Sequence, residues 1–248
     1  MIPLFKSHYS AGRSILTLDD PKKCLPVGPQ SIIKIAKDAG LKQIVLLEDN
    51  PHSFFEAQKM CGANHLGLVY GMTVWMCNSL AAETGDEKPT INSHHKLAVF
   101  IKDAAGYVDF LRLYKACQAN KGLMDYALLK TLWTDHLVAA IPFYDSFLHL
   151  NLLTYSNCVP DLSFLSPTFF VEKNGLPFDE MIRGAVLKFS KDVEETKTIY
   201  YHSRSDADAY MTYRCLTSRS FGKQKTLSRP NLDHFSSCEF CWEAFQNG

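Results

Sequence analysis

The stretch LGLVYGMTVWM, residues 66–76, decides the fold. It is an apolar run that predicts a β-strand over 67–75. A helical pattern precedes it, and Ser53 with Glu56, spaced as a capping box, indicates where that helix begins. Short apolar runs and helical patterns alternate in this way along the chain. Such alternation is typical of parallel strands joined by crossover helices, so we predict an α/β protein.

Six further apolar runs raise the number of predicted strands to seven. No shift in composition, internal repeat or low-complexity tract divides the chain, and 248 residues with 46% hydrophobic content suffice for a well-buried core. We therefore expect one domain over 1–248. Two turn-rich segments, 81–93 and 156–167, predict loops. The predicted strands cover 2–5, 43–47, 67–75, 97–101, 137–142, 168–172 and 197–201.

Helix boundaries follow from capping signals. The segment 31–40 carries an inward apolar stripe and ends at Gly40, which suits a left-handed cap. The segment 103–119 carries a similar stripe. A serine followed three residues later by an acidic residue predicts two further helix starts, at Ser205 and Ser236.

Charge and cysteine content narrow the class of protein. Twenty-six Lys and Arg balance twenty-six Asp and Glu, so the overall charge gives no argument for nucleic acid, an anionic membrane or an acidic partner. No run reaches the ~20 apolar residues of a membrane helix, and no export signal is visible. We expect a cytoplasmic protein with reduced cysteines. Cys238 and Cys241 invite a zinc or redox interpretation, but a helix across them favours packing.

Four segments, taken in order, resemble one known family. They are FFEAQKMCG, LGLVYGMTVWM around Gly71, HHKLAVFIKDAAGYVDFLRLY with Gly106, Tyr107 and Leu111 in register, and TKTIYYHSRSDADAYMTYRCL. Together they resemble PHP domains, the phosphoesterase module at the front of bacterial DNA polymerase III alpha subunits. A stand-alone version is similar to proteins of tailed phages. The resemblance implies a distorted seven-stranded, TIM-like (β/α)7 barrel with two or three divalent ions at the carboxyl ends of its strands.

Most positions of the family's metal ligands carry other residues here. The first motif, H-x-H-S-x-Y-S, aligns with residues 4–10, so that both histidines are replaced, by Leu4 and Lys6. In the second motif Asp49 keeps the carboxylate, whereas Asn50 stands in place of the histidine. The remaining ligand positions align with Thr73, with His95 or else His94, and with Thr198 and Tyr200.

The lysine on the first strand changes the expected chemistry. Lys6 would bring an ammonium group to the place where the family binds cations, and we expect it to pair with Glu48 or Asp49. This predicts a degenerate PHP barrel that has lost its metals, and no cofactor is expected. The alternative is a single residual ion held by Asp49 and His95, with Zn or Mn as the metal if the protein is an enzyme.

Polar residues at or just beyond the predicted strand ends are the candidate site, because such barrels carry their sites on that face. They would form either a reshaped pocket or a set of hydrogen-bonded remnants that organise loops, and the second interpretation is favoured. The candidates are Lys6, His8, Glu48, Asp49, His95, Tyr144, Asp145, Glu172, Tyr200 and His202.

Three functions follow from these features. The first is a non-catalytic protein that binds a polymerase or another replication protein in phage or bacterial DNA metabolism, in the host cytoplasm if phage-encoded. The second is an active phosphoesterase or 3'-5' exonuclease with a rebuilt site. The third is a single-stranded nucleic acid binder that uses a basic segment over 201–231. The basic residues of that segment are Arg204, Arg214, Arg219, Lys223, Lys225 and Arg229.

Overall fold

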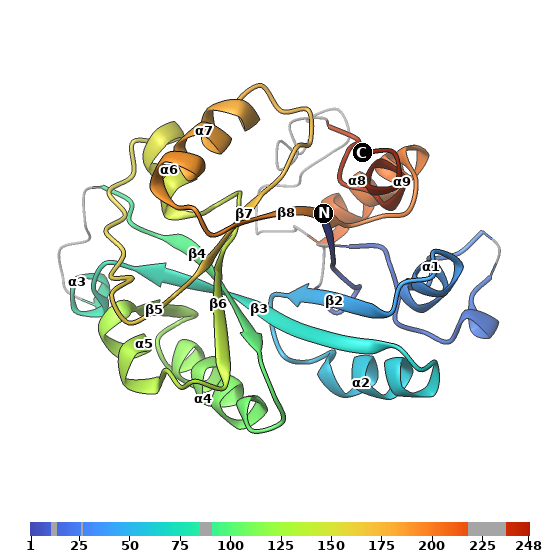
Figure 1. The fold of residues 1–248 in the computed structure, drawn as a ribbon, viewed down its shortest axis with the longest axis horizontal. Coiled ribbons are helices and arrows are strands. Elements are labelled where there is room, and N and C mark those ends of the chain that lie inside the picture. Colours follow the sequence, from blue (N-terminus) through green and yellow to red (C-terminus); the bar gives the residue numbers. More distant parts are fainter. Residues whose placement is uncertain (11–13, 26, 85–90, 218–236) are drawn as a thin grey trace.

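A computed structural model describes residues 1–10, 14–25, 27–84, 91–217 and 237–248. Seven strands form a closed barrel surrounded by helices (Figure 1), which confirms the predicted TIM-like α/β fold. The ring runs β1-β2-β3-β4-β6-β7-β8 and closes where β8 pairs with β1. Its strands are β1 (Ile2–Phe5), β2 (Gln43–Glu48), β3 (Gly67–Cys77), β4 (His95–Ile101), β6 (Leu137–Ile141), β7 (Thr168–Val171) and β8 (Val193–Ile199).

The predicted strand bounds agree with the structure within two residues except at the last strand, and one strand was not predicted. The last strand begins at Val193 and ends at Ile199, four residues earlier at its start than predicted and two at its end. An extra strand, β5 (Leu123–Asp125), pairs with the end of β3 outside the ring. β5 is only three residues long, so it carries no periodic pattern that a sequence could display.

Strand β4 departs from the all-parallel arrangement. It pairs antiparallel with both β3 and β6, whereas the other ring pairings are parallel. The physical reason lies in the preceding connection, in which the described part holds only the short helix α3 (Leu80–Thr84). The described residues of this connection hold no full crossover helix of the kind that joins parallel strands, and the chain re-enters the sheet in the opposite direction. The start of β4, at His95, therefore lies beside Met76 near the carboxyl end of β3.

The helices follow the capping signals in part. Ser31 caps α1 through its side chain, and Gly40 adopts the left-handed conformation, as predicted. Ser53 precedes α2 without a side-chain cap, and the capping box near residue 205 belongs to Ser203 with Asp206. The predicted helix across the C-x-x-C pair is wrong, since α9 begins one residue after Cys241. The helices are α1 (Ile32–Asp38), α2 (Phe54–Ala63), α4 (Gly106–Ala119), α5 (Tyr126–Leu132), α6 (Phe147–Leu153), α7 (Asp179–Phe189), α8 (Ala207–Thr217) and α9 (Trp242–Gln246).

Alternate residues of each strand build two separate apolar layers. One set packs under the helices in the main core, and the other fills the barrel interior. Inside, the rings of Phe100 and Phe170 meet with centroids 6.1 Å apart. All eight cysteines are free thiols, and none of the described helices is long and apolar enough to cross a membrane. The interior layer consists of Leu4, Val45, Leu47, Ala98, Phe100, Ala140 and Phe170, flanked by Ile2 and Val69.

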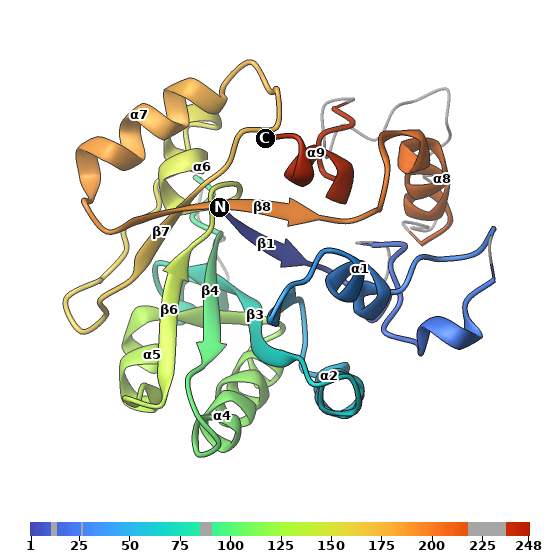
Figure 2. The same ribbon diagram turned by 45° about the vertical axis from the view of Figure 1, so that its right-hand side comes forward.

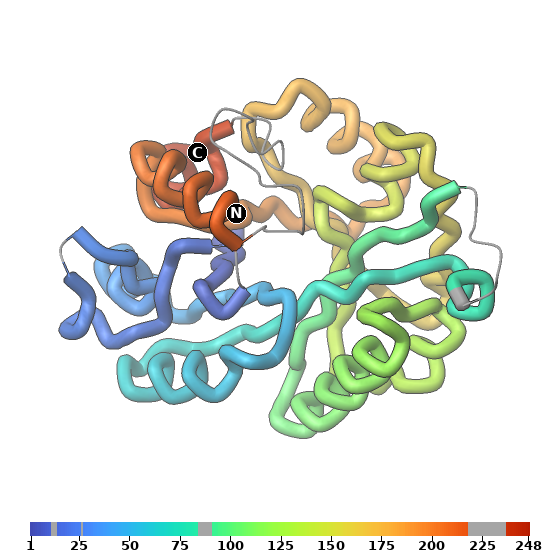
Figure 3. The backbone as a smooth tube through the Cα atoms, turned by 180° about the vertical axis from the view of Figure 1, so that it is seen from behind, coloured from blue at the N-terminus to red at the C-terminus, as the bar shows by residue number. Residues whose placement is uncertain are grey.

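The two ends of the chain meet on one side of the barrel. Figure 2 shows β1 and β8 side by side, in the register that pairs Leu4 with Thr198. From behind, Figure 3 shows the C-terminal helices beside the N-terminal segment. The Phe5 ring stacks on Trp242 of α9, with centroids 5.6 Å apart. The last helix is thus part of the barrel's outer layer.

Gly71 faces the barrel interior with no room for a larger residue. A Cβ there would lie 2.5 Å from Cδ1 of Phe100 and 2.9 Å from the carbonyl oxygen of Val99. We expect Gly71→Ala to lower the free energy of unfolding by about 1–3 kcal/mol, measured by urea denaturation. Gly184→Ala in α7 is the matched control, because a Cβ there meets nothing within 4 Å. That control should be neutral or stabilising by about 0.5–1 kcal/mol, and equal effects at both sites would contradict the prediction.

Candidate functional site

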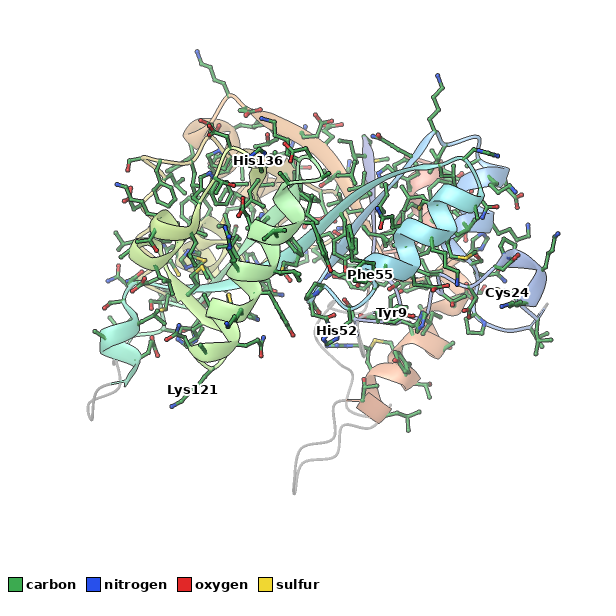
Figure 4. All side chains as sticks on the ribbon, turned by 90° about the horizontal axis from the view of Figure 1, so that it is seen from below. Tyr9, Cys24, His52, Phe55, Lys121 and His136 are labelled. Carbon is green, nitrogen blue, oxygen red and sulfur yellow. The ribbon has the colours of Figure 1, made fainter. Side chains whose placement is uncertain are left out.

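A belt of polar side chains continues the interior apolar layer toward the carboxyl ends of the parallel strands. We call this end the barrel mouth, and its belt is Lys6, Asp49, Thr73, Lys96, Glu172 and Thr198. Figure 4 separates the two ends of the barrel: Tyr9 and His52, which follow β1 and β2, lie away from His136, which precedes β6. The barrel mouth is the end at which the sequence places its candidate site.

An ion pair lies at the centre of this belt. Lys6 Nζ is 2.8 Å from Oδ1 of Asp49, and the Thr73 hydroxyl donates to the same oxygen at 2.9 Å. The Lys6 side chain is 7% exposed and that of Asp49 35%. The expected pairing of Lys6 is confirmed, with Asp49 as the partner.

Glu48 organises the loop after β1 from the outer side of the strands. It is fully buried, accepts from the Ser7 backbone N–H at 3.0 Å, and accepts a hydrogen bond from the Ser10 hydroxyl. The Asp49 backbone N–H donates to that hydroxyl oxygen at 3.0 Å. Burial raises the pKa of Glu48, while Lys6 and the two serines act in the opposite direction. The carboxylate therefore ties β2 to the loop that carries Ser7 and Ser10.

Glu172 links β8 to the loop after β7 by hydrogen bonds, as Glu48 links β2 to the loop after β1. It accepts from the Thr198 hydroxyl at 2.5 Å, the Thr198 backbone N–H at 3.1 Å and the Asn174 side-chain amide at 2.8 Å. Burial is the main cause that raises its pKa. The same amide donates to the Tyr144 hydroxyl at 3.0 Å, which donates to Asp179 at 2.8 Å. Tyr144 and Glu172 thus belong to one buried network.

A second lysine reaches the mouth from β4. Lys96 Nζ is 2.6 Å from Oδ2 of Asp145 and 4.8 Å from the centroid of the Trp75 ring. The backbone N–H of Lys96 also donates to the Asp145 carbonyl at 2.7 Å. Asp145 has a φ of 58°, a left-handed conformation that aspartate tolerates better than most residues. Both mouth lysines are therefore paired with carboxylates.

His95 does not join the barrel mouth. It alternates with Lys96, shares the outward side of β4 with Leu97, and is fully buried under the helices. Its Nδ1 lies 2.9 Å from the Ser93 carbonyl and its Nε2 2.9 Å from the Tyr126 hydroxyl. Burial lowers its pKa. The structure therefore gives no support to a metal ion shared by Asp49 and His95.

The other candidate residues contact separate neighbours. His8 is exposed and stacks against Tyr9 with centroids 4.4 Å apart, and Tyr200 packs against the rings of Tyr210 and Phe240. The His202 carbonyl accepts from a backbone N–H of α9. Within the described parts of the chain, no three His, Cys, Asp or Glu side chains form a group that could hold a metal ion.

The basic segment is described only at its start. Arg204 forms two hydrogen bonds to Glu239, at 2.8 and 2.9 Å, and one to Glu243 at 2.8 Å. Arg214 is buried. The Arg204 guanidinium, whose side chain is 37% exposed, is thus already bonded to two carboxylates. The other four basic residues, Arg219, Lys223, Lys225 and Arg229, lie outside the described residues.

Asn174 and Asp179 are site residues that the sequence interpretation missed. Asp179 accepts from the backbone N–H groups of Asn174 and Leu176, at 2.8 and 3.1 Å, so it fixes the turn after β7. Asn174 followed by Gly175 is a turn-forming pair directly after a predicted strand, and Gly175 has a φ of 71°. This Asn-Gly pair was the signal that could have found them.

The Lys6–Asp49 pair should contribute measurably to stability. We expect Lys6→Met, Asp49→Asn and the double variant to give a coupling free energy of roughly 1–2 kcal/mol in a double-mutant cycle, because the ammonium is buried although the carboxylate is a third exposed. Urea denaturation of the four proteins measures it. The exposed pair Lys34–Asp38 in α1 is the control and should couple by less than about 0.5 kcal/mol. Equal coupling in both cycles would contradict this account.

Glu48 should impose a pH dependence on stability. Because its pKa in the folded chain is raised above the ordinary 4.5, the folded state binds the proton more tightly than the unfolded state. The contribution of Glu48 to the free energy of unfolding is therefore complete below pH 4.5, and it is lost as the pH rises through the pKa of the folded state. We expect the unfolding free energy of wild type minus that of Glu48→Gln to fall as pH increases over that window.

Urea denaturation at a series of pH values measures this difference. Glu180→Gln, in which an exposed carboxylate of α7 is removed, controls for the general effect of losing a negative charge. A wild-type minus Glu48→Gln difference that stays constant, or rises with pH, would show that the carboxylate is not perturbed in this way.

Comparison of the sequence with known protein families and with curated proteins found no match. The chemistry of the barrel mouth is therefore argued from its own contacts.

Proposed function

We propose that this chain is a non-catalytic, PHP-like barrel that acts through a protein partner in DNA replication or metabolism. The observation that carries the proposal is the buried Lys6 ammonium, 2.8 Å from Asp49 at the barrel mouth. In a metal-dependent phosphoesterase that carboxylate would face a divalent ion, which lowers the pKa of a bound water and clamps the phosphate. Here the same carboxylate is instead paired with the ammonium group of Lys6.

Electrostatics explain why the lysine and a metal centre are alternatives. A divalent ion bound at Asp49 would lie within a few ångströms of the Lys6 ammonium, and in a partly buried site two cations at that distance repel by several kcal/mol. Asp49 already accepts from Lys6 and Thr73. The neighbouring carboxylates Glu48 and Glu172 are engaged with serine, threonine and asparagine donors. This pairing supports a structural rather than a catalytic mouth.

The same geometry supports the resemblance to PHP domains. Lys6, Asp49 and Thr73 align with three ligand positions of the family, and in the fold they are joined by hydrogen bonds. Thr198, a fourth such position, lies beside Leu4 in the strand register. Residues from four distant parts of the sequence thus meet at the end of the barrel where the family binds its ions. His95 is the position that does not fit.

A protein partner follows from the loss of chemistry. A barrel that keeps its fold without a metal centre can still bind another protein through its outer surface. PHP domains attached to polymerases are thought to act structurally when they lose their metals. We propose a replicative polymerase or another replication protein as the partner, encountered in the cytoplasm. Binding to single-stranded nucleic acid through the basic segment is the second candidate.

Metal content tests the proposal directly. We expect purified protein, dialysed against Zn and Mn and then against metal-free buffer, to retain substoichiometric metal, because the ammonium opposes binding. It should not cleave labelled single-stranded DNA in the presence of Mn. Lys6→His, which returns an imidazole beside Asp49, should retain more Zn than either wild type or Lys6→Met. Stoichiometric metal in wild type that is lost in Asp49→Asn would overturn the proposal.

Two binding experiments separate the remaining candidates. Titration of the full chain against the replicative polymerase of the encoding organism should give saturable binding if the partner is a polymerase. Titration against single-stranded DNA at low and high salt should show affinity that falls steeply with salt if phosphate contacts dominate. DNA binding without polymerase binding would favour the second candidate.

A further inference from the structure

A cleft of about 420 Å³ lies on the outside of the barrel. It lies over the outer face of β8, between α7 and α9; Figure 2 shows both helices above this strand, α7 toward its start and α9 toward its end. We call it the β8 cleft. Its charged lining residues are Lys173, Arg183, Lys197 and Arg204, facing Glu172, Glu195 and Glu239.

Lys197 is the unusual member of this lining. It lies on the outward side of β8, and the residue is 4% exposed. Its ammonium donates one hydrogen bond, to the Lys173 carbonyl at 2.9 Å, and forms no ion pair within the described parts of the chain. An ammonium carries three donors, so two N–H groups remain for a ligand. Burial lowers its pKa, as expected for a charge that is incompletely solvated.

The two arginines of the cleft are already paired. Arg183 pairs with Glu195 at 2.7 Å, and Arg204 pairs with Glu239 and Glu243 at 2.8 Å. Glu172 and Glu239 favour the charged form of Lys197, but their printed hydrogen bonds go to other residues. The Lys197 ammonium is therefore buried with a single hydrogen bond and no direct ion pair in the described residues. Burial of a charge without its full set of partners is unfavourable, and an anion in the cleft would reduce that penalty.

We propose that the β8 cleft binds a small oxyanion, a carboxylate or phosphate group, through the ammonium of Lys197. The volume admits a group of this size with part of the molecule that carries it. The bound anion would accept the two remaining N–H donors of Lys197 in charge-assisted hydrogen bonds. This proposal does not rest on the function proposed above.

Calorimetric titration of the full chain with sulfate, and separately with acetate, at constant ionic strength tests the site. We expect saturable one-site binding of at least one probe, and the tighter probe tells a tetrahedral from a planar anion. In Lys197→Met affinity should fall by about tenfold or more, whereas Lys197→Arg should retain binding and the exposed Lys191→Met should change affinity by less than about twofold. Lys197→Gln replaces Lys197→Met if the latter does not fold. Absence of saturable binding of both probes, or equal affinity in wild type and Lys197→Met, would overturn the proposal.

Discussion

Buried carboxylates must be paired or hydrogen-bonded, and this constraint organises the barrel mouth. Glu48 accepts hydrogen bonds from the backbone N–H of Ser7 and the hydroxyl of Ser10, so it fixes the loop that leaves β1. Glu172 accepts hydrogen bonds from Thr198 and Asn174, and so it fixes the ends of β7 and β8. The ring closes where β8 pairs with β1. Glu48 acts on the β1 side of this pairing and Glu172 on the β8 side. Two pairs of strand ends, those of β1 and β2 and those of β7 and β8, are thus held by these two residues.

Lys6 fits this frame because its neighbours present oxygen atoms that suit a cation. An oxygen-rich strand end that could surround a divalent ion can also accept an ammonium, which brings its own donors and needs no ligand from solvent. Asp49 then accepts hydrogen bonds from both Lys6 and Thr73. The charges of this arrangement are therefore compensated within the chain.

The seven strands and the class of the fold could be predicted, because apolar runs that alternate with helical patterns, as 67–75 does with the helix before it, are typical of this class. The pairing of Lys6 could also be predicted, since it depends only on charges at neighbouring strand ends. The direction of β4 could not, because strand polarity depends on the connection before it and not on the strand's own residues. The orientation of His95 could not be predicted either, because the sequence left open which of His94 and His95 faces inward; in the fold His95 lies on the outward side and is buried against Tyr126.

The pairing of β1 with β8 has a consequence for how the molecule is made. Strand β1 finds one partner, β2, soon after it leaves the ribosome, but its other edge matches residues 196–199. Until those residues are synthesised, the barrel exists as an open sheet with an unpaired apolar edge at Ile2 and Leu4. The nascent chain must therefore carry an exposed strand edge until residues 196–199 have been synthesised, a state in which association with other chains competes with closure of the ring.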